Sequence, residues 1–203
     1  CPWCGTELTR DSLTVEPSVS NPREVVVSCA DFTCEYAAGR NPQGLPVLFV
    51  DEQVYRELPA FLVATVDKFA MLPWRGESGM LFGRVHTREG HRFHGPVDGP
   101  PRPGQPGKGE VLLPQGLRPP ELIVQDELHL ISGPLGTMVG LYETAIEELC
   151  ARTEGGQRIV PKVIASTATV RRAAQQVQSL MGRPDVRAFP PQGPDPGETF
   201  FAA

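Results

Sequence analysis

Two apolar runs that end in polar residues decide the fold of the C-terminal half: LIVQDELH at residues 122–129 and KVIASTAT at residues 162–169. Each run has the length and β-branched content of a buried strand. Between them, apolar residues recur at helical spacing and predict a helix over about 137–153, which Gly155 and Gly156 end. Strand, helix and strand joined by short links imply a parallel α/β sheet.

The polar residues that follow the two runs form a candidate site. Ligands of open α/β sheets bind beyond the carboxyl ends of the strands, so Asp126, Glu127, Ser166 and Thr167 are expected side by side at one edge. Asp126 suits water-mediated binding of a divalent metal, and Glu127 suits the activation of an attacking water. His129 suits nucleotide sensing or a link to a moving partner. Ser166 and Thr167 are also compatible with a helix N-cap.

Three segments, in this order, resemble the motifs of superfamily 2 helicases. FLVATVDKF at 61–69 is similar to the segment that carries motif Ib, residues 126–129 form a DExH box, and residues 166–169 match a Ser-Ala-Thr-type motif III. The stretch QDELHLISGPLGT at 125–137 is more particular. Together with FPPQG at 189–193, it resembles the helicase component, DrmA, of bacterial DISARM anti-phage systems.

The resemblance implies a domain organisation. Residues 46–75 and 121–185 would form a partial RecA-like lobe with helices flanking a parallel sheet. Residues 76–120, rich in Pro and Gly, would be a loop insertion in this lobe. Residues 186–203 would be an extended tail that leads to the next lobe.

The resemblance also implies an activity, an ATP-dependent helicase or translocase that acts on nucleic acid, most simply DNA, in cytoplasmic phage defence. Other defence-system proteins are expected partners, and ATP and Mg²⁺ are expected cofactors of the full-length protein. Asp126 would hold Mg²⁺ through water, and Glu127 and His129 would complete the catalytic set. Ser166, Thr167 and Thr169 would couple the nucleotide state to movement, while Thr65 and Lys68 would touch a strand phosphate.

A phosphate-binding P-loop is missing from the sequence. The nearest match, GQPGKG at 104–109, has Gly after the lysine instead of Ser or Thr, and no strand precedes it. Members of the resembled family carry their P-loop upstream, and this chain opens with Cys1 instead of Met. We therefore expect an internal piece of a longer protein that does not hydrolyse ATP by itself.

Four cysteines near the N-terminus predict a zinc module over residues 1–45. Cys1 and Cys4 form one close pair, and Cys29 and Cys34 form a second, slightly wider pair 24 residues later. Four thiolates in two pairs suit the tetrahedral preference of Zn²⁺. A redox CxxC, structural disulfides and free buried thiols are the alternatives. We expect a zinc-ribbon-like fold. The role of zinc in it would be structural, because so short a segment buries too little apolar area to fold without a bound metal.

Composition sets the remaining limits. The chain of 203 residues carries a net charge of −5 and has a pI near 5.4, which counts mildly against a dedicated nucleic-acid module. It has no apolar run near the ~20 residues that span a bilayer, so no membrane partner is expected. The alternative to a helicase is a non-catalytic, zinc-stapled module that binds protein or nucleic acid.

Overall fold

The computed structural model of the chain describes residues 1–99, 109–130 and 133–167, together with 177–178, 182–183, 186–187 and 189. The chain divides into two compact units, residues 1–118 and 119–203. Thr169 and most of the expected tail lie outside the described residues. The grouping of 46–75 with 121–185 in one lobe therefore stays a prediction.

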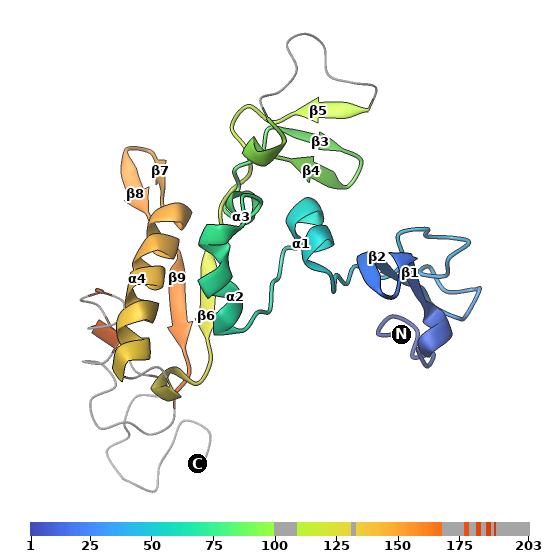
Figure 1. The fold of residues 1–203 in the computed structure, drawn as a ribbon, viewed down its shortest axis with the longest axis horizontal. Helices are drawn as coiled ribbons and strands as arrows, with labels where there is room; N and C mark the ends of the chain where they lie inside the picture. The colour runs from blue at the N-terminus through green and yellow to red at the C-terminus, as the bar shows by residue number, and fades with distance from the viewer. Residues whose placement is uncertain are drawn as a thin grey trace, which may run out of the picture. The chain divides into compact units, whose positions relative to one another are not determined.

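The first unit begins with a two-stranded hairpin. A short 3-10 turn, η1 (Arg10–Ser12), leads into β1 (Leu13–Ser18), which pairs antiparallel with β2 (Asn21–Val27) (Figure 1). The buried amide of Gln53 accepts a hydrogen bond of 2.8 Å from the N–H of Val25. This bond ties the hairpin to the following helix, α1 (Asp51–Glu57).

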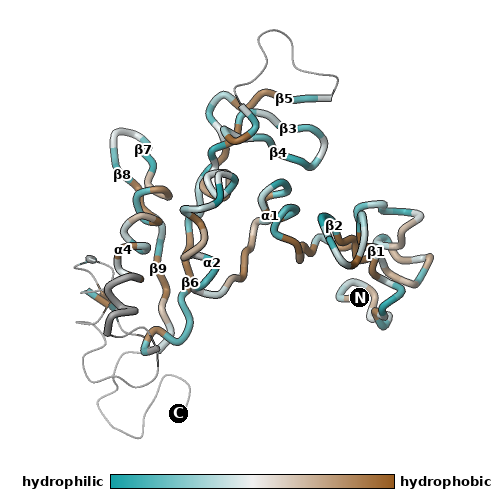
Figure 2. Tube along the Cα trace, in the orientation of Figure 1, coloured by the Kyte–Doolittle hydropathy of each residue, from teal (hydrophilic) through white to brown (hydrophobic). Residues whose placement is uncertain are grey.

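The sequence of the first unit predicts helices over 52–58 and 67–72 and a buried strand over 61–65; both helices are confirmed, and the strand is wrong. Besides α1, the structure contains α2 (Val66–Met71), which passes into η2 (Leu72–Trp74) at Pro73. The run 61–65 was expected to be a buried strand, but it is extended chain without a paired neighbour among the described residues. Phe61 and Val63 are 80% and 81% exposed, and this connection between α1 and α2 is hydrophobic in Figure 2. Apolar composition alone does not make a strand, which needs a partner for its hydrogen bonds.

Within residues 76–120, the described parts, 76–99 and 109–120, contain more regular structure than the loop insertion that the sequence predicts. After α3 (Ser78–Leu81), three short strands form an antiparallel sheet in the order β4-β3-β5: β3 (Thr87–Glu89), β4 (Arg92–His94) and β5 (Glu110–Leu112). The turn η3 (Pro96–Asp98) follows β4. Strands of three residues are too short to show a period of two, which explains why the sequence pattern misses them. Met80 and Val85 are buried in this part of the unit.

The second unit is built around a parallel pair of strands. β6 (Leu122–Gln125) leads through η4 (Leu128–Leu130) into α4 (Gly133–Cys150), and the chain returns as β9 (Lys162–Ala165) (Figure 1). β6 pairs with β9 in register, from Leu122 opposite Lys162 to Gln125 opposite Ala165. Both predicted strands and the helix between them are confirmed. The structure shows a mixed α/β fold with small sheets, and a larger RecA-like sheet stays a proposal.

A hairpin that the sequence does not predict lies between α4 and β9. β7 (Arg152–Glu154) and β8 (Gln157–Ile159) pair antiparallel across Gly155 and Gly156, whose φ angles are 57° and 80°. Two consecutive positive φ values are what a tight two-residue hairpin turn requires. The Gly pair was expected to end the helix, which instead ends at Cys150. Cys150 is fully buried, as its apolar context predicts.

Candidate functional site

The parallel pair of strands brings the two predicted motifs together. The N–H of Ser166 donates to the carbonyl of Gln125 at 2.9 Å, and the N–H of Leu128 donates to the carbonyl of Ser166 at 2.9 Å. These two bonds continue the ladder of β6 and β9 beyond the last strand residues. They therefore fix the acidic motif against the hydroxyl motif at the carboxyl edge of the sheet.

The side chains of the two motifs are also in contact. The hydroxyl of Ser166 donates a hydrogen bond to Asp126 Oδ1 and lies 3.4 Å from the backbone nitrogen of Glu127, which donates to it. The same N–H donates to Asp126 Oδ1 at 3.0 Å. Asp126, Glu127, Ser166 and Thr167 are all exposed at this edge. The predicted meeting of the acidic pair with the hydroxyl of Ser166 is thus present in the geometry.

Glu127 has an unusual backbone. Its φ is +52°, a left-handed conformation that costs a non-glycine residue about 1–3 kcal/mol. The next residue, Leu128, is 1% exposed and anchors the turn in the core. This turn leaves the Glu127 side chain 58% exposed, with Oε2 lying 3.2 Å from Nδ1 of His129. The strained residue therefore presents its carboxylate to solvent at the site.

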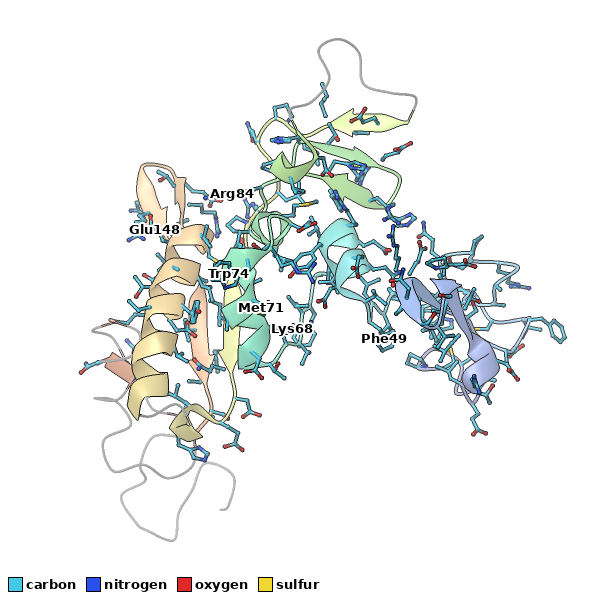
Figure 3. The ribbon with its side chains drawn as sticks, in the orientation of Figure 1. Phe49, Lys68, Met71, Trp74, Arg84 and Glu148 are labelled. Atoms are coloured by element: carbon cyan, nitrogen blue, oxygen red, sulfur yellow. The ribbon has the colours of Figure 1, made fainter. Side chains whose placement is uncertain are left out.

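The remaining predicted site residues differ in their settings. Thr65 and Lys68 lie in the first unit, where Lys68 is on α2 (Figure 3) and its N–H donates to the carbonyl of Thr65 at 3.0 Å. The ammonium group of Lys68 already contacts Asp51. Thr167 is exposed at the end of β9, and Thr169 lies outside the described residues. Their functional roles remain predictions.

The four N-terminal cysteines form a cluster that fits a metal. The sulfurs of Cys1, Cys4, Cys29 and Cys34 all lie within 4.8 Å of one another. A tetrahedral zinc with bonds of about 2.3 Å places its sulfurs roughly 3.8 Å apart, so the set matches this ion. Cys4 and Cys29 have sulfurs 3.5 Å apart, far longer than the ~2.05 Å of a disulfide, and all four cysteines are free.

Groups around the cluster stabilise the thiolate of Cys4 and fix the loops. Hydrogen bonds with the hydroxyl and the backbone of Thr6 lower the pKa of Cys4 from 9.0 to about 7. The N–H of Tyr36 donates to Cys34 at 3.5 Å, and Gly5, at a φ of 82°, donates its N–H to the carbonyl of Cys1 at 2.9 Å. Trp3, between Cys1 and Cys4, and Tyr36, two residues after Cys34, pack edge to face with ring centroids 5.7 Å apart. The two loops are therefore held together by aromatic packing as well as by sulfur.

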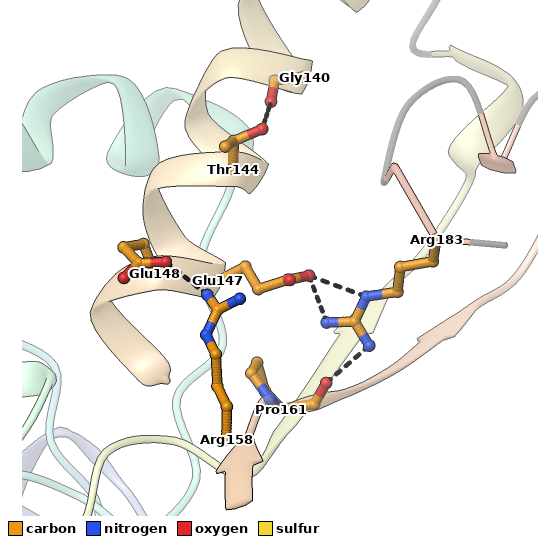
Figure 4. A network of polar contacts seen from close by, with 7 residues as sticks. All are labelled: Gly140, Thr144, Glu147, Glu148, Arg158, Pro161 and Arg183. Carbon is orange, nitrogen blue, oxygen red and sulfur yellow. Dashed lines mark hydrogen bonds and ion pairs between the residues drawn. The ribbon is translucent and has the colours of Figure 1, made fainter. Parts of the chain in front are cut away.

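Sequence reasoning missed an arginine that joins three parts of the second unit. Arg183 donates from Nε and Nη2 to Glu147 Oε2 at 2.9 and 2.6 Å, and from Nη1 to the carbonyl of Pro161 at 2.8 Å (Figure 4). It thus ties the chain beyond motif III to α4 and to the start of β9. Nearby, burial raises the pKa of Glu143, against the opposing charge of Arg183. No local pattern signals such a contact across 36 residues.

Comparison with known proteins identifies a relative. The chain is 40% identical over 211 aligned residues to "DISARM protein DrmA" of Bacillus paralicheniformis, and this match covers all of the chain and 18% of that protein. No protein-family model matches the chain. Among the described helices, none has the length and hydrophobicity needed to cross a bilayer. Over its whole length, the chain is thus similar to a segment of DISARM protein DrmA, as its motifs predict.

Proposed function

We propose that this chain is the part of an ATP-dependent nucleic-acid helicase or translocase that carries its DExH box, acting in cytoplasmic phage defence. The observation that carries the proposal is the contact between Asp126 and Ser166 at the carboxyl ends of β6 and β9. Two motifs 40 residues apart meet where α/β sheets bind nucleotides. Similarity to a DISARM protein supports the role in defence.

The proposed roles follow from the chemistry of each side chain. Bound Mg²⁺ would neutralise phosphate charge, and Asp126 would hold it through water. Glu127, exposed beyond the sheet edge, would orient and deprotonate the attacking water. His129 contacts Glu127 and would sense the state of the site. Ser166, which bonds Asp126, would pass that state with Thr167 and Thr169 to the rest of the motor.

Nucleic acid, most simply DNA, would be held by other residues of the chain. Thr65 and Lys68 would contact a strand phosphate, an assignment supported by the resemblance of residues 61–69 to motif Ib. The four cysteines would bind a structural zinc ion. We expect the 203 residues alone to be inactive, because no P-loop is present in their sequence.

A single isosteric change tests the catalytic proposal in the full-length protein. Glu127→Gln keeps the size of the side chain but removes the base, so it should abolish ATP turnover and leave ATP binding intact. Glu121→Gln is the matched control, because Glu121 precedes β6 at the opposite end of the strand and pairs with Arg152. It should leave turnover unchanged.

Undiminished turnover in Glu127→Gln would favour the alternative, a non-catalytic module stapled by zinc that binds protein or nucleic acid. The observation behind this alternative is the cysteine cluster, which forms a complete ligand set without any residue of the proposed catalytic site. The acidic pI of 5.4 also counts against an enzyme that acts on nucleic acid, because proteins that bind nucleic acid usually have a basic surface.

A further inference from the structure

The cysteine module carries two aromatic side chains that remain largely exposed. Trp3 lies between the first two cysteines and is 61% exposed, and Phe32 lies between the second two and is 82% exposed. Large aromatic residues in small modules are normally needed in the core. Here each cysteine loop instead presents one aromatic ring to solvent.

The fold holds each of these two rings in a defined setting. The four sulfurs lie within 4.8 Å of one another, so both loops start and end at the same point. Trp3 is fixed by its edge-to-face contact with Tyr36, whose N–H in turn donates to the sulfur of Cys34. The loop of Phe32 is fixed by Asp31, which accepts hydrogen bonds from the N–H and hydroxyl of Thr33 at 2.8 and 2.7 Å. The rings are thus displayed by rigid loops.

The net charge of the cysteine module selects the kind of partner. Residues 1–45 contain six acidic side chains against three arginines, a formal charge of −3, and four thiolates around Zn²⁺ would add about −2. Asp31 directly precedes Phe32 within its loop, and Glu35 directly follows Cys34, where the loop ends. An acidic surface repels phosphate, so a nucleic-acid strand is disfavoured here even though bases stack on aromatic rings. Aromatic faces beside carboxylates instead attract guanidinium and ammonium groups.

We propose that the two cysteine loops form a docking surface for an arginine- or lysine-bearing segment of a partner polypeptide, with Phe32 and Trp3 receiving the cationic side chains. The carboxylates of Asp31 and Glu35 supply the long-range attraction. This surface is separate from the ATPase proposed above, and neither depends on the other.

The test uses the zinc-loaded 203-residue chain and a defined probe. Trp74→Phe leaves Trp3 as the single tryptophan, so its fluorescence reports on the docking surface. The probe is a nine-residue peptide of alternating Arg and Gly, compared with a Glu–Gly peptide of the same length and with an oligo-dT strand. We expect a saturable change in Trp3 emission with the Arg peptide alone, weakened by salt.

Variants of Phe32 separate the ring from simple bulk. Phe32→Leu keeps an apolar side chain but loses the ring face, so its affinity for the Arg peptide should be about 3- to 10-fold lower. Phe32→Tyr keeps the ring face and should bind the Arg peptide with the affinity of the parent. Val19→Ala is the matched control, since Val19 is a 77% exposed apolar residue at the tip of the β1–β2 hairpin. Zinc content measured on each variant confirms that the module is intact.

Three results would overturn the proposal. If the Glu peptide bound as tightly as the Arg peptide, the charge argument would fail. Oligo-dT binding that Phe32→Leu abolishes would make the surface a nucleic-acid site. If Phe32→Leu and the parent bound the Arg peptide with equal affinity at unchanged zinc content, a role of the Phe32 ring in binding would be excluded.

Discussion

The ammonium group of Lys68 lies 2.7 Å from Oδ2 and 3.0 Å from Oδ1 of Asp51, at the start of α1. The hydrogen bond with Asp51 raises the pKa of Lys68, so the lysine stays charged. The proposed contact of Lys68 with a strand phosphate must therefore compete with a carboxylate of the same unit. Because both side chains are largely exposed, replacing the carboxylate by a phosphate as the partner of Lys68 costs little free energy.

The competition predicts opposite effects for the two partners. Asp51→Asn should tighten binding of single-stranded DNA to the full-length protein, because it frees Lys68. Lys68→Ala should weaken binding and lower the slope of log K against log salt by about 1. Fluorescence anisotropy over a salt series measures both. Arg88→Ala, a change at an exposed cation of β3, is the control; an equal loss there would indicate general charge attraction instead of a specific contact.

Zinc removal should unfold the cysteine module. Its hairpin, β1–β2, is short, and most of its residues are exposed, so the apolar area it buries offsets little conformational entropy. We expect one zinc per chain, lost together with the far-UV and aromatic signals of the module on chelation. Cys29→Ser should reduce the zinc content to near zero, whereas Cys150→Ala, a change in the second unit, should leave it at one. A full zinc complement in Cys29→Ser would contradict the four-cysteine site.

The salt bridge between Arg56 and Asp98 predicts a loss of stability in acid. Arg56 donates two hydrogen bonds to the Asp98 carboxylate, at 2.6 and 2.8 Å, and this lowers the pKa of Asp98 below its ordinary 3.8. Because the folded pKa is depressed, the stabilisation is complete above the unfolded pKa and is lost as pH falls below about 3.8. We expect a contribution of about 1 kcal/mol, given the partial exposure of the pair.

Intrinsic fluorescence measures this effect, since both tryptophans, Trp3 and Trp74, lie in the first unit. Denaturant unfolding followed at pH 7 and pH 3 should show that Asp98→Asn lowers stability at pH 7 and makes little difference at pH 3. The control, Glu16→Gln in β1, replaces an exposed carboxylate. If Asp98→Asn lost the same free energy at both pH values, the ion pair would not be the cause.

The second unit should depend on Arg183 more than on other surface cations. Arg183→Ala removes three hydrogen bonds and leaves Glu147, 28% exposed, without this donor, at a cost of about 1–3 kcal/mol. Arg183→Lys should restore only part of this stability, because one ammonium group cannot reproduce the three directed hydrogen bonds of the planar guanidinium group. Arg158→Ala is the control, since its pair with Glu148 (Figure 4) is more than half exposed and should contribute under about 1 kcal/mol. Hydrogen exchange of the α4 amides measures the difference.

The sequence predicts well those features that depend on local pattern. The runs at 122–125 and 162–165 are strands because each concentrates β-branched residues, and their helical connection allows parallel pairing. The cysteine cluster follows from spacing. Contacts between distant segments were not predictable: Asp51 and Arg183 have no local signature, and Gly155–Gly156 fits a helix end as well as a hairpin turn. The exposed run at 61–65 was misread because its apolar residues are consistent with a strand only where a neighbouring strand is present.

The backbone and the carboxylate of Glu127 can be separated by one substitution. Glycine adopts a φ of +52° without strain, so Glu127→Gly should keep the turn after β6 and stabilise it by up to about 1 kcal/mol, while the proposed base is lost. ATP turnover of the full-length protein should vanish despite equal or greater stability. Ser166→Ala is the complementary change, because it removes the hydroxyl that bonds Asp126 and the N–H of Glu127 but leaves the carboxylate in place. It should retain a weak turnover that no longer responds to DNA. Full activity of Glu127→Gly would show that the chemistry does not need this carboxylate, and the acidic pair would then serve the turn alone.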